Sequence, residues 1–140
     1  MLAINYNIAV REMTPTDSSS FSVDSSEYKE LAIPIEQYIQ GAIEGKSSTM
    51  KAVFHPSAQI YGYLDGELLA DPIQVLYDYV EQHPPASTLE YAIRSIDVSD
   101  GAATARVEIS GWHEHTYTDF FTLLKIEGQW KIINKIFDQH

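Results

Sequence analysis

The segment Phe54-His55-Pro56-Ser57-Ala58-Gln59-Ile60-Tyr61-Gly62-Tyr63-Leu64-Asp65-Gly66 contains the signals that decide the fold. Pro56 has a fixed φ and biases the residue before it toward an extended backbone, so a preceding helix should end near Phe54. Residues 58–64 have the pattern of a strand, and Asp65-Gly66 is typical of the two-residue turn of a β-hairpin. The segment therefore predicts a helix end, a strand and a hairpin in succession.

Length and composition limit the classes of protein to consider. The chain has 140 residues, which is typical of one domain with its own core. Its formal net charge of −11 repels phosphate backbones and anionic lipid, so we expect neither nucleic acid nor a membrane as a partner. There is no Cys, which excludes disulfides and Cys-ligated metals. Without a secretory signal or a membrane-length apolar stretch, the sequence predicts a cytoplasmic protein.

The chain divides into two parts by composition. Residues 1–24 end in a run rich in Ser and Thr, and they predict an N-terminal extension that is either flexible or an edge strand. Residues 25–140 carry the periodic apolar patterns. We therefore expect the folded domain to span residues 25–140.

The first helix is the strongest local prediction. Asp24 and Glu27 have the spacing of a capping box, and apolar residues recur at helical spacing from 28 to 43. Pro34 interrupts this pattern and lacks a backbone N–H, which predicts a kink or two abutting helices. A short second helix is expected to begin at Ser47.

The rest of the chain predicts one more helix and a set of long strands. Asp71-Pro72 has the form of an N-cap followed by proline at the first helical position, and this third helix should end at His83-Pro84-Pro85. The strands are expected at residues 87–99, 102–112, 116–126 and 129–138. The prediction is an α+β fold in which three N-terminal helices pack against a strongly curved, mainly antiparallel sheet of four to six strands.

One predicted strand is apolar on both faces. Phe120-Phe121 and Leu123-Leu124 place large apolar side chains alternately on the two sides of the sheet. Helices can cover only one side. We therefore expect a homodimer in which a second subunit covers the other face of the sheet.

A family resemblance extends over residues 25–140 rather than resting on one short motif. The residues that carry it are Tyr38-Ile39, Gly41, Gly45, Phe54-His55-Pro56, Ala58, Gly62-Tyr63, Gly66, Ile96-Asp97-Val98, Tyr117-Thr118-Asp119, Leu123-Leu124-Lys125, Gly128, Trp130-Lys131-Ile132, Asn134-Lys135 and His140. With them the chain resembles the putative lumazine-binding family of the nuclear-transport-factor-2-like superfamily, to which SnoaL-like proteins and ketosteroid isomerases also belong. The resemblance implies a cystatin-like cone with a pocket between sheet and helices. It also hints at a planar, pteridine-like ligand.

The resemblance does not select one activity, because this fold supports isomerases, dehydratases, cyclases and binding domains. In an alignment with ketosteroid isomerase, Tyr38 matches the tyrosine that donates a hydrogen bond to the substrate oxyanion. Gly62 falls on the position of the carboxylate base, and glycine cannot remove a proton. Isomerase chemistry of that type is therefore not expected unless the acid or base comes from elsewhere in the cone.

The candidate ligand-binding residues are Tyr38, His55, Gly62, Asp119, Phe121, Asn134 and Lys135. The leading interpretation is a small-molecule-binding domain with a mostly apolar pocket, without a cofactor. The first alternative is an isomerase, dehydratase or polyketide-cyclase-like enzyme with His55 or Asp119 as acid or base and Tyr38 as oxyanion donor. The second is a ligand-free interaction module. Gly62 is open to two interpretations, empty volume in the pocket or close backbone approach.

The partner of Asp119 depends on the last hairpin. A two-residue turn at Glu127-Gly128 puts Asp119 on the same face as Asn134, whereas a three-residue loop puts it with Lys135. The sequence is compatible with both registers. His113 and His115 have a spacing found in metal sites, but no third ligand follows, so no metal site is expected.

Overall fold

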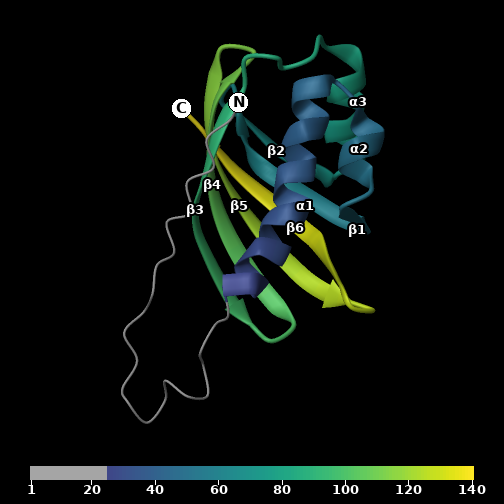
Figure 1. Ribbon diagram of the computed structural model, residues 1–140. Helices are drawn as coiled ribbons and strands as arrows, with labels where there is room; N and C mark the ends of the chain where they lie inside the picture. Colours follow the sequence, from purple (N-terminus) through teal and green to yellow (C-terminus); the bar gives the residue numbers. More distant parts are fainter. Residues whose placement is uncertain (1–24) are drawn as a thin grey trace.

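The computed structural model describes residues 25–140, so the extension at residues 1–24 and Asp24 of the predicted capping box lie outside the described residues. The order of elements is α1 (Ser25–Glu44), α2 (Ser47–Lys51), β1 (Phe54–Leu64), β2 (Glu67–Pro72), α3 (Gln74–Gln82), β3 (Glu90–Ser99), β4 (Ala102–Trp112), β5 (His115–Ile126) and β6 (Gln129–Gln139) (Figure 1).

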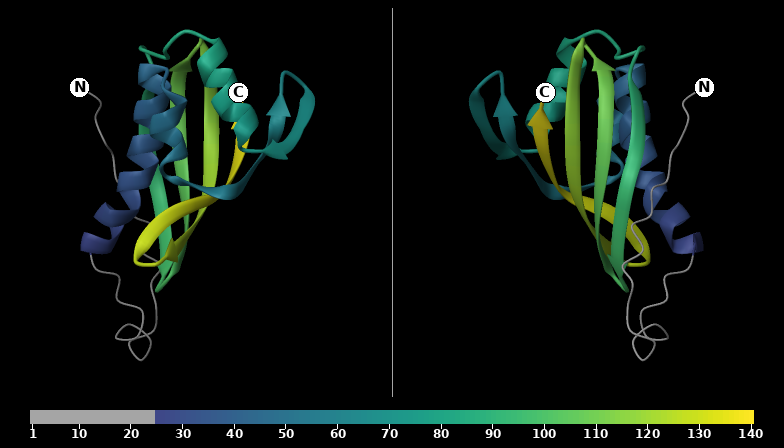
Figure 2. Two further views of the ribbon diagram at one scale, coloured as in Figure 1. Left: turned by 90° about the vertical axis from the view of Figure 1, so that its right-hand side faces the viewer. Right: turned by 90° about the vertical axis from the view of Figure 1, so that its left-hand side faces the viewer.

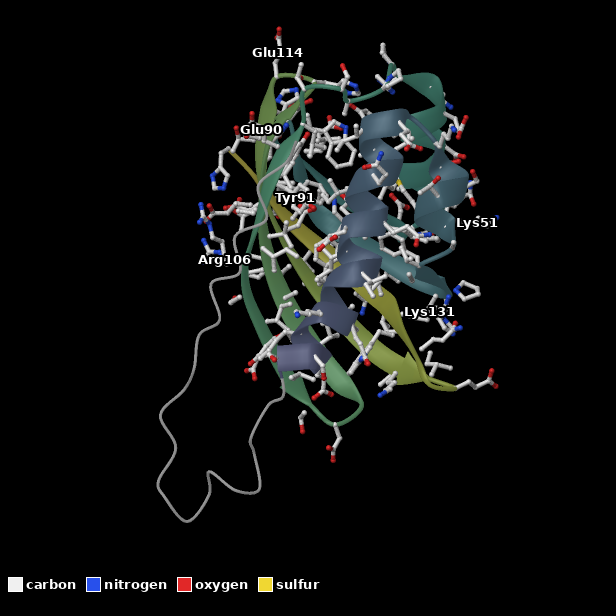
Figure 3. All side chains as sticks on the ribbon, in the orientation of Figure 1. Lys51, Glu90, Tyr91, Arg106, Glu114 and Lys131 are labelled. Carbon is white, nitrogen blue, oxygen red and sulfur yellow. The ribbon has the colours of Figure 1, made fainter. Side chains whose placement is uncertain are left out.

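The strands form one curved sheet with the order β2-β1-β6-β5-β4-β3. Strands β1 and β6 run parallel, and every other neighbouring pair is antiparallel. All three helices lie on the same side of this sheet (Figure 2). Arg106 of β4 extends from the opposite side (Figure 3). The predicted α+β fold is therefore confirmed, with six strands and one parallel pair.

Helix α1 is continuous, so the expectation of two abutting helices was wrong. Pro34 lies inside the helix and is buried on its apolar face. Its missing N–H costs one helical hydrogen bond. Leu31 and Ile35, one turn apart, are fully buried against the core, and such burial of apolar side chains offsets that loss. In the part of the chain that the structure describes, no helix is both long enough and apolar enough to cross a bilayer.

The residues around Asp71-Pro72 end a strand instead of capping a helix, which corrects the predicted start of α3. Asp71 pairs with Ile60 and Pro72 pairs with Gln59, so β2 continues through both residues. A proline at the end of an edge strand needs no partner for an N–H, which makes this position compatible with it. Helix α3 then starts at Gln74.

The hairpin turn at Asp65-Gly66 has the predicted conformation, and the turn at Glu127-Gly128, whose length the sequence left open, has the same one. Asp65 and Gly66 have φ values of 51° and 83°, and Glu127 and Gly128 have φ values of 51° and 80°. Positive φ at both central residues is the geometry of the turn that best fits the twist of a hairpin.

The last hairpin combines features of both predicted registers. The turn has two residues, because Ile126 pairs with Gln129. Further along, Leu123 pairs with Ile132 and Thr122 pairs with Asn134, so the ladder skips Ile133. This β-bulge changes the face of every following residue in β6. Lys135 thereby pairs with Phe121 and lies on the inner side of the sheet.

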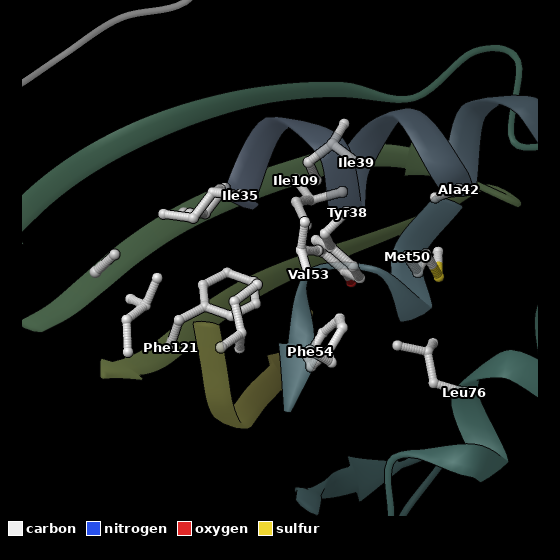
Figure 4. Close-up of a cluster of buried hydrophobic side chains, with 14 of the residues drawn as sticks. Ile35, Tyr38, Ile39, Ala42, Met50, Val53, Phe54, Leu76, Ile109 and Phe121 are labelled. Atoms are coloured by element: carbon white, nitrogen blue, oxygen red, sulfur yellow. The ribbon is translucent and has the colours of Figure 1, made fainter. Parts of the chain in front are cut away.

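The core between α1 and the sheet is centred on Tyr38. Its ring is fully buried and makes edge contacts with Phe54, at a centroid distance of 5.7 Å, and with Phe121, at 5.5 Å (Figure 4). Edge-to-face contacts of this kind stabilise aromatic clusters beyond the burial of their area. The cluster fixes the position of the helix over the sheet.

Candidate functional site

An apolar cavity of about 170 Å³ lies between α3 and the inner side of the sheet. Its lining residues come from six elements and are Ile60, Leu64, Leu69, Val75, Leu76, Tyr79, Trp112, Tyr117, Lys135 and Phe137. Leu64, Leu69, Tyr79 and Tyr117 are half-buried, whereas Lys135 and Trp112 are buried. Lys135 is the only charged residue in this lining.

Lys135 has an unusual environment for an ammonium group. It is 5% exposed, and its Nζ lies 3.4 Å from Oδ2 of Asp119. Around the ammonium stand three aromatic rings, with centroids 5.0 Å (Phe137), 5.6 Å (Tyr38) and 5.9 Å (Trp112) from Nζ. Such rings attract a cation through their electron-rich faces. One ion pair and three rings therefore hold the amine at the cavity wall.

Asp119 lies behind Lys135, outside the cavity lining. Its side chain is completely buried, and the Tyr38 hydroxyl donates a hydrogen bond of 3.3 Å to Oδ2. Burial raises the pKa of Asp119, although Lys135 and the Tyr38 hydroxyl act in the opposite direction. Burial and then the nearby carboxylate raise the pKa of Tyr38 well above its usual value. Oδ1 of Asp119 has no hydrogen-bond partner among the described residues.

The structure brings four of the seven candidate residues together. Tyr38, Asp119, Phe121 and Lys135 form one buried cluster, and of these only Lys135 reaches the cavity. The His55 side chain interacts with its neighbour Ser57: its Nδ1 accepts a hydrogen bond from the Ser57 backbone N–H at 3.1 Å and lies 2.7 Å from the Ser57 hydroxyl. His55 is therefore engaged away from the cavity lining.

Asn134 and Gly62 serve the packing of strands. Asn134 Oδ1 accepts a hydrogen bond of 3.3 Å from the backbone N–H of Gln59, which joins β6 to β1. A Cβ on Gly62 would lie 2.6 Å from the carbonyl oxygen of Phe137 and 2.7 Å from its ring. The space beside Gly62 is thus filled by Phe137, so the position is one of close backbone approach and not of empty volume.

Sequence reasoning did not include four aromatic residues of the cavity among the candidates: Tyr79, Trp112, Tyr117 and Phe137. The alternation along β4 does not extend to Trp112, because the β4–β5 register shifts between Ile109 and Trp112. Gly111 has a φ of +70° at this shift. Tyr79 did carry a signal, since it follows Val75 at helical spacing.

His113, which follows β4, is held by hydrogen bonds to Tyr79 and Pro84. Its Nε2 lies 2.7 Å from the carbonyl oxygen of Pro84, which can only accept, so Nε2 carries the proton. Nδ1 then accepts from the Tyr79 hydroxyl at 2.8 Å. His115 lies apart, with Nδ1 3.4 Å from Nε2 of Gln139. Within residues 25–140, no three His, Asp or Glu side chains are grouped as a metal site.

Comparisons with known proteins agree with this architecture. A family model described as "Putative lumazine-binding" matches residues 26–138. The chain is 33% identical over 119 residues to the aldolase FrzH of Cladobotryum sp., with 84% of this chain and 95% of that protein covered.

Two solved structures are similar to the whole described domain. One is an NTF2-like protein of unknown function from Methylobacillus flagellatus KT, with a TM-score of 0.81, 34% identity, and coverage of 85% of this chain and 96% of that chain. The other is an NTF2-like protein of unknown function from Shewanella baltica OS155, with a TM-score of 0.79, 32% identity, and coverage of 85% and 98%. Together with the match to the family model, these findings show that the chain belongs to the putative lumazine-binding family and has its NTF2-like fold.

Proposed function

We propose that this chain is a small-molecule-binding domain and that its ligand occupies the cavity of about 170 Å³. The observation that carries the proposal is a single buried cation, Lys135, in a lining that is otherwise apolar and aromatic. Pockets with apolar walls and a few polar groups are typical of ligand sites, because the polar groups orient what the walls bind. The assigned ligand class is a small apolar compound with one oxygen directed at Lys135.

The size of the cavity limits the ligand. An engineered apolar cavity of about 150 Å³ holds benzene, so a cavity of similar volume suits one ring or a short branched chain. A pteridine has polar atoms on several edges, and the lining offers few partners for them besides Lys135 and two tyrosine hydroxyls. An apolar ring with one polar oxygen therefore fits better than the pteridine that the family description suggests.

The second candidate is an enzyme, and the relative named as an aldolase favours it. The acid or base of such an enzyme would need to reach the ligand. Asp119 is engaged by Lys135 and Tyr38 behind the cavity wall, and His55 does not line the cavity. Within the lining, Lys135 is the group that supports a chemical role.

The sheet face away from the helices supports a homodimer, which we include in the proposal. Tyr61 pairs with Ile136, Ile136 with Phe120, and Phe120 with Arg106, so these four residues form one row across β1, β6, β5 and β4. The row is 40% exposed at Tyr61, 50% at Ile136 and 43% at Phe120. A second copy of the chain that packs against this row would bury it.

The ligand proposal is tested with p-cresol, a single apolar ring that carries one hydroxyl. Isothermal titration calorimetry of the purified protein with p-cresol should show saturable binding. Leu69→Trp should weaken it by at least about tenfold, because the larger side chain fills the cavity. Native mass spectrometry of the same preparation, followed by denaturation, identifies any small molecule that the protein carries from the cell.

The matched control is Leu68→Trp. Leu68 is the neighbour of Leu69 on β2, but it is exposed and does not line the cavity. It should leave p-cresol binding unchanged. Equal binding by both variants, or no binding by the wild-type protein together with no carried molecule, would contradict the proposal and favour the ligand-free interaction module.

A further inference from the structure

The environment of Lys135 is poorly explained by a structural role alone. Among the described residues, its ammonium has one anionic partner, Asp119, at 3.4 Å, and otherwise faces aromatic rings and the cavity. A buried ion pair is often no more stabilising than apolar side chains of the same volume, because both charges lose their hydration. The pair therefore needs an explanation other than stability.

We propose that the Lys135 amine is a nucleophile that forms an imine with a small apolar aldehyde or ketone bound in the cavity. The inference rests on the proposed function, since the carbonyl compound must first occupy the same cavity. A lysine amine in an apolar pocket is a known type of activated nucleophile for carbonyl compounds, because the pocket favours the uncharged amine. Of the groups at the wall, only Lys135 combines a nitrogen nucleophile with access to the cavity.

Asp119 is placed to make the amine reactive. Transfer of one proton from Nζ of Lys135 to Oδ2 of Asp119 turns a buried ion pair into a neutral amine and a neutral carboxylic acid, with no change in net charge. Burial raises the pKa of the Asp119 carboxyl, which favours its protonated, neutral form. The Tyr38 hydroxyl, 3.3 Å from Oδ2, keeps this carboxyl oriented toward the amine. Asp119 thus acts through Lys135 without touching the ligand.

The chemical step is balanced with the groups present. The lone pair of the neutral Lys135 amine attacks the carbonyl carbon, a C–N bond forms as the C–O π bond breaks, and one proton passes from the nitrogen to the oxygen to give a carbinolamine. Asp119 returns the transferred proton to the Lys135 nitrogen, from which it passes to the hydroxyl; the C–O bond then breaks, and one water molecule leaves. The products are a protonated imine on Lys135 and the Asp119 carboxylate, which again form an ion pair. No oxidant, reductant or metal takes part.

The cavity also defines the carbonyl compounds that react. Its volume of about 170 Å³ and its apolar walls suit an aromatic aldehyde or a cyclic ketone with one ring. A carboxylated carbonyl compound would bring a negative charge into a lining whose single cation, Lys135, is already paired with Asp119. We therefore expect neutral aldehydes and ketones to react and keto acids of the same size to react poorly.

The test is reductive trapping with benzaldehyde. The full-length protein is incubated briefly with benzaldehyde and sodium cyanoborohydride, which reduces an imine to a stable secondary amine. Peptide mapping by mass spectrometry then measures the modified fraction of each lysine. Lys135 should be trapped at least about ten times faster than half-buried Lys131, whose amine donates to the Ala52 carbonyl outside the cavity lining, because binding holds the aldehyde beside the Lys135 amine. Figure 3 shows Lys131 at the surface near α2.

Three comparisons keep the outcome interpretable. Lys135→Met should abolish the fast reaction, and the matched variant Lys131→Met should retain it. Because Lys135→Met also leaves Asp119 buried without its partner, an excess of toluene, an inert ring without a carbonyl, provides a second test in the wild-type protein. Toluene should slow the trapping of Lys135 and leave that of Lys131 unchanged.

The possible failures are distinguishable. If p-cresol binds but Lys135 is trapped no faster than Lys131, the imine is refuted and the binding function stands. If the trapping at Lys135 is fast but toluene does not slow it, the reaction does not occur in the cavity and the inference is refuted. If neither binding nor selective trapping occurs, the inference and the proposed function fail together.

Discussion

Gly62 is the residue at which the backbone leaves least room for change. A Cβ there would meet the carbonyl oxygen and the ring of Phe137 at 2.6–2.7 Å, and the oxygen belongs to a backbone that is fixed by the sheet. Forcing the strands apart would also displace the ring that lines the cavity.

We therefore predict that Gly62→Ala lowers the free energy of unfolding by about 1–3 kcal/mol, because an added methyl group overpacks the contact between β1 and β6. Urea denaturation measures the change. Gly101→Ala is the matched control. Its nearest neighbour, Cβ of Lys125, is 4.0 Å away, so its effect should stay within about 0.5 kcal/mol. Equal midpoints for the two variants would contradict the predicted clash.

At this scale the sequence predicted the chemistry of the site better than its geometry. A carboxylate beside two phenylalanines indicated that Asp119 is buried and needs a partner, and Lys135 was one of two candidates. The choice between them depends on a bulge at Ile133, and an apolar residue in an apolar strand gives no sign of a bulge. His55 was singled out for its chemistry, but its hydrogen bonds to Ser57 are local.

Among the elements, the pairing of β1 with β6 is the least regular. The β1–β6 register shifts between Phe54 and Gln59, and opposite this shift the β5–β6 ladder skips Ile133. Asn134 stands where the two irregularities meet, and its side chain accepts the Gln59 N–H at 3.3 Å. This side-chain hydrogen bond joins the two strands at the irregularity.

Asn134→Ala should lower the free energy of unfolding by about 1 kcal/mol, since it removes the acceptor of a half-buried N–H. Thermal unfolding measures the loss, and faster hydrogen exchange of the Gln59 amide localises it. Gln129→Ala, an exposed position of the same strand, should change neither quantity. Unchanged exchange at Gln59 in Asn134→Ala would show that another group holds this amide.

The elements themselves were largely readable from the sequence. The glycine-containing pairs Asp65-Gly66 and Glu127-Gly128 indicated the positions of these two hairpin turns, and the 3.6-residue periodicity indicated α1. The pair Asp71-Pro72 led to a wrong prediction of the start of α3. The same pair suits a helix start and the end of an edge strand, and only the pairing with β1 decides between them. Local sequence cannot contain that information, since the partner strand is a separate segment.

For the whole molecule, the exposed row of Tyr61, Ile136, Phe120 and Arg106 argues for self-association. The Arg106 guanidinium lies 5.5 Å from the centroid of the Phe120 ring, which leaves an amphipathic surface of the kind found in interfaces. Each chain has a formal net charge of −11, so two copies repel each other at long range. Salt screens this repulsion, and association should strengthen as ionic strength rises.

Light scattering at micromolar concentration should therefore give twice the chain mass of 15.8 kDa for the wild-type protein. Phe120→Lys and Ile136→Lys should give the mass of one chain, because a desolvated lysine at the centre of an interface is costly. Ile33→Lys is the control, since Ile33 is an exposed apolar residue on α1, outside the row. A monomeric wild-type protein, or lysine variants that remain dimers, would contradict the proposed interface.

Ile133, the residue of β6 that has no partner in the β5–β6 ladder, affects how related sequences should be aligned. Because Ile133 is accommodated outside the ladder, the number of positions between the turn and the amine does not determine which side of the sheet the amine occupies. An alignment that counts from Gly128 without a gap would equate Asn134 in this chain with an inward-facing position in a chain that lacks the extra residue. The nucleophile is better located by its cross-strand neighbour Phe121.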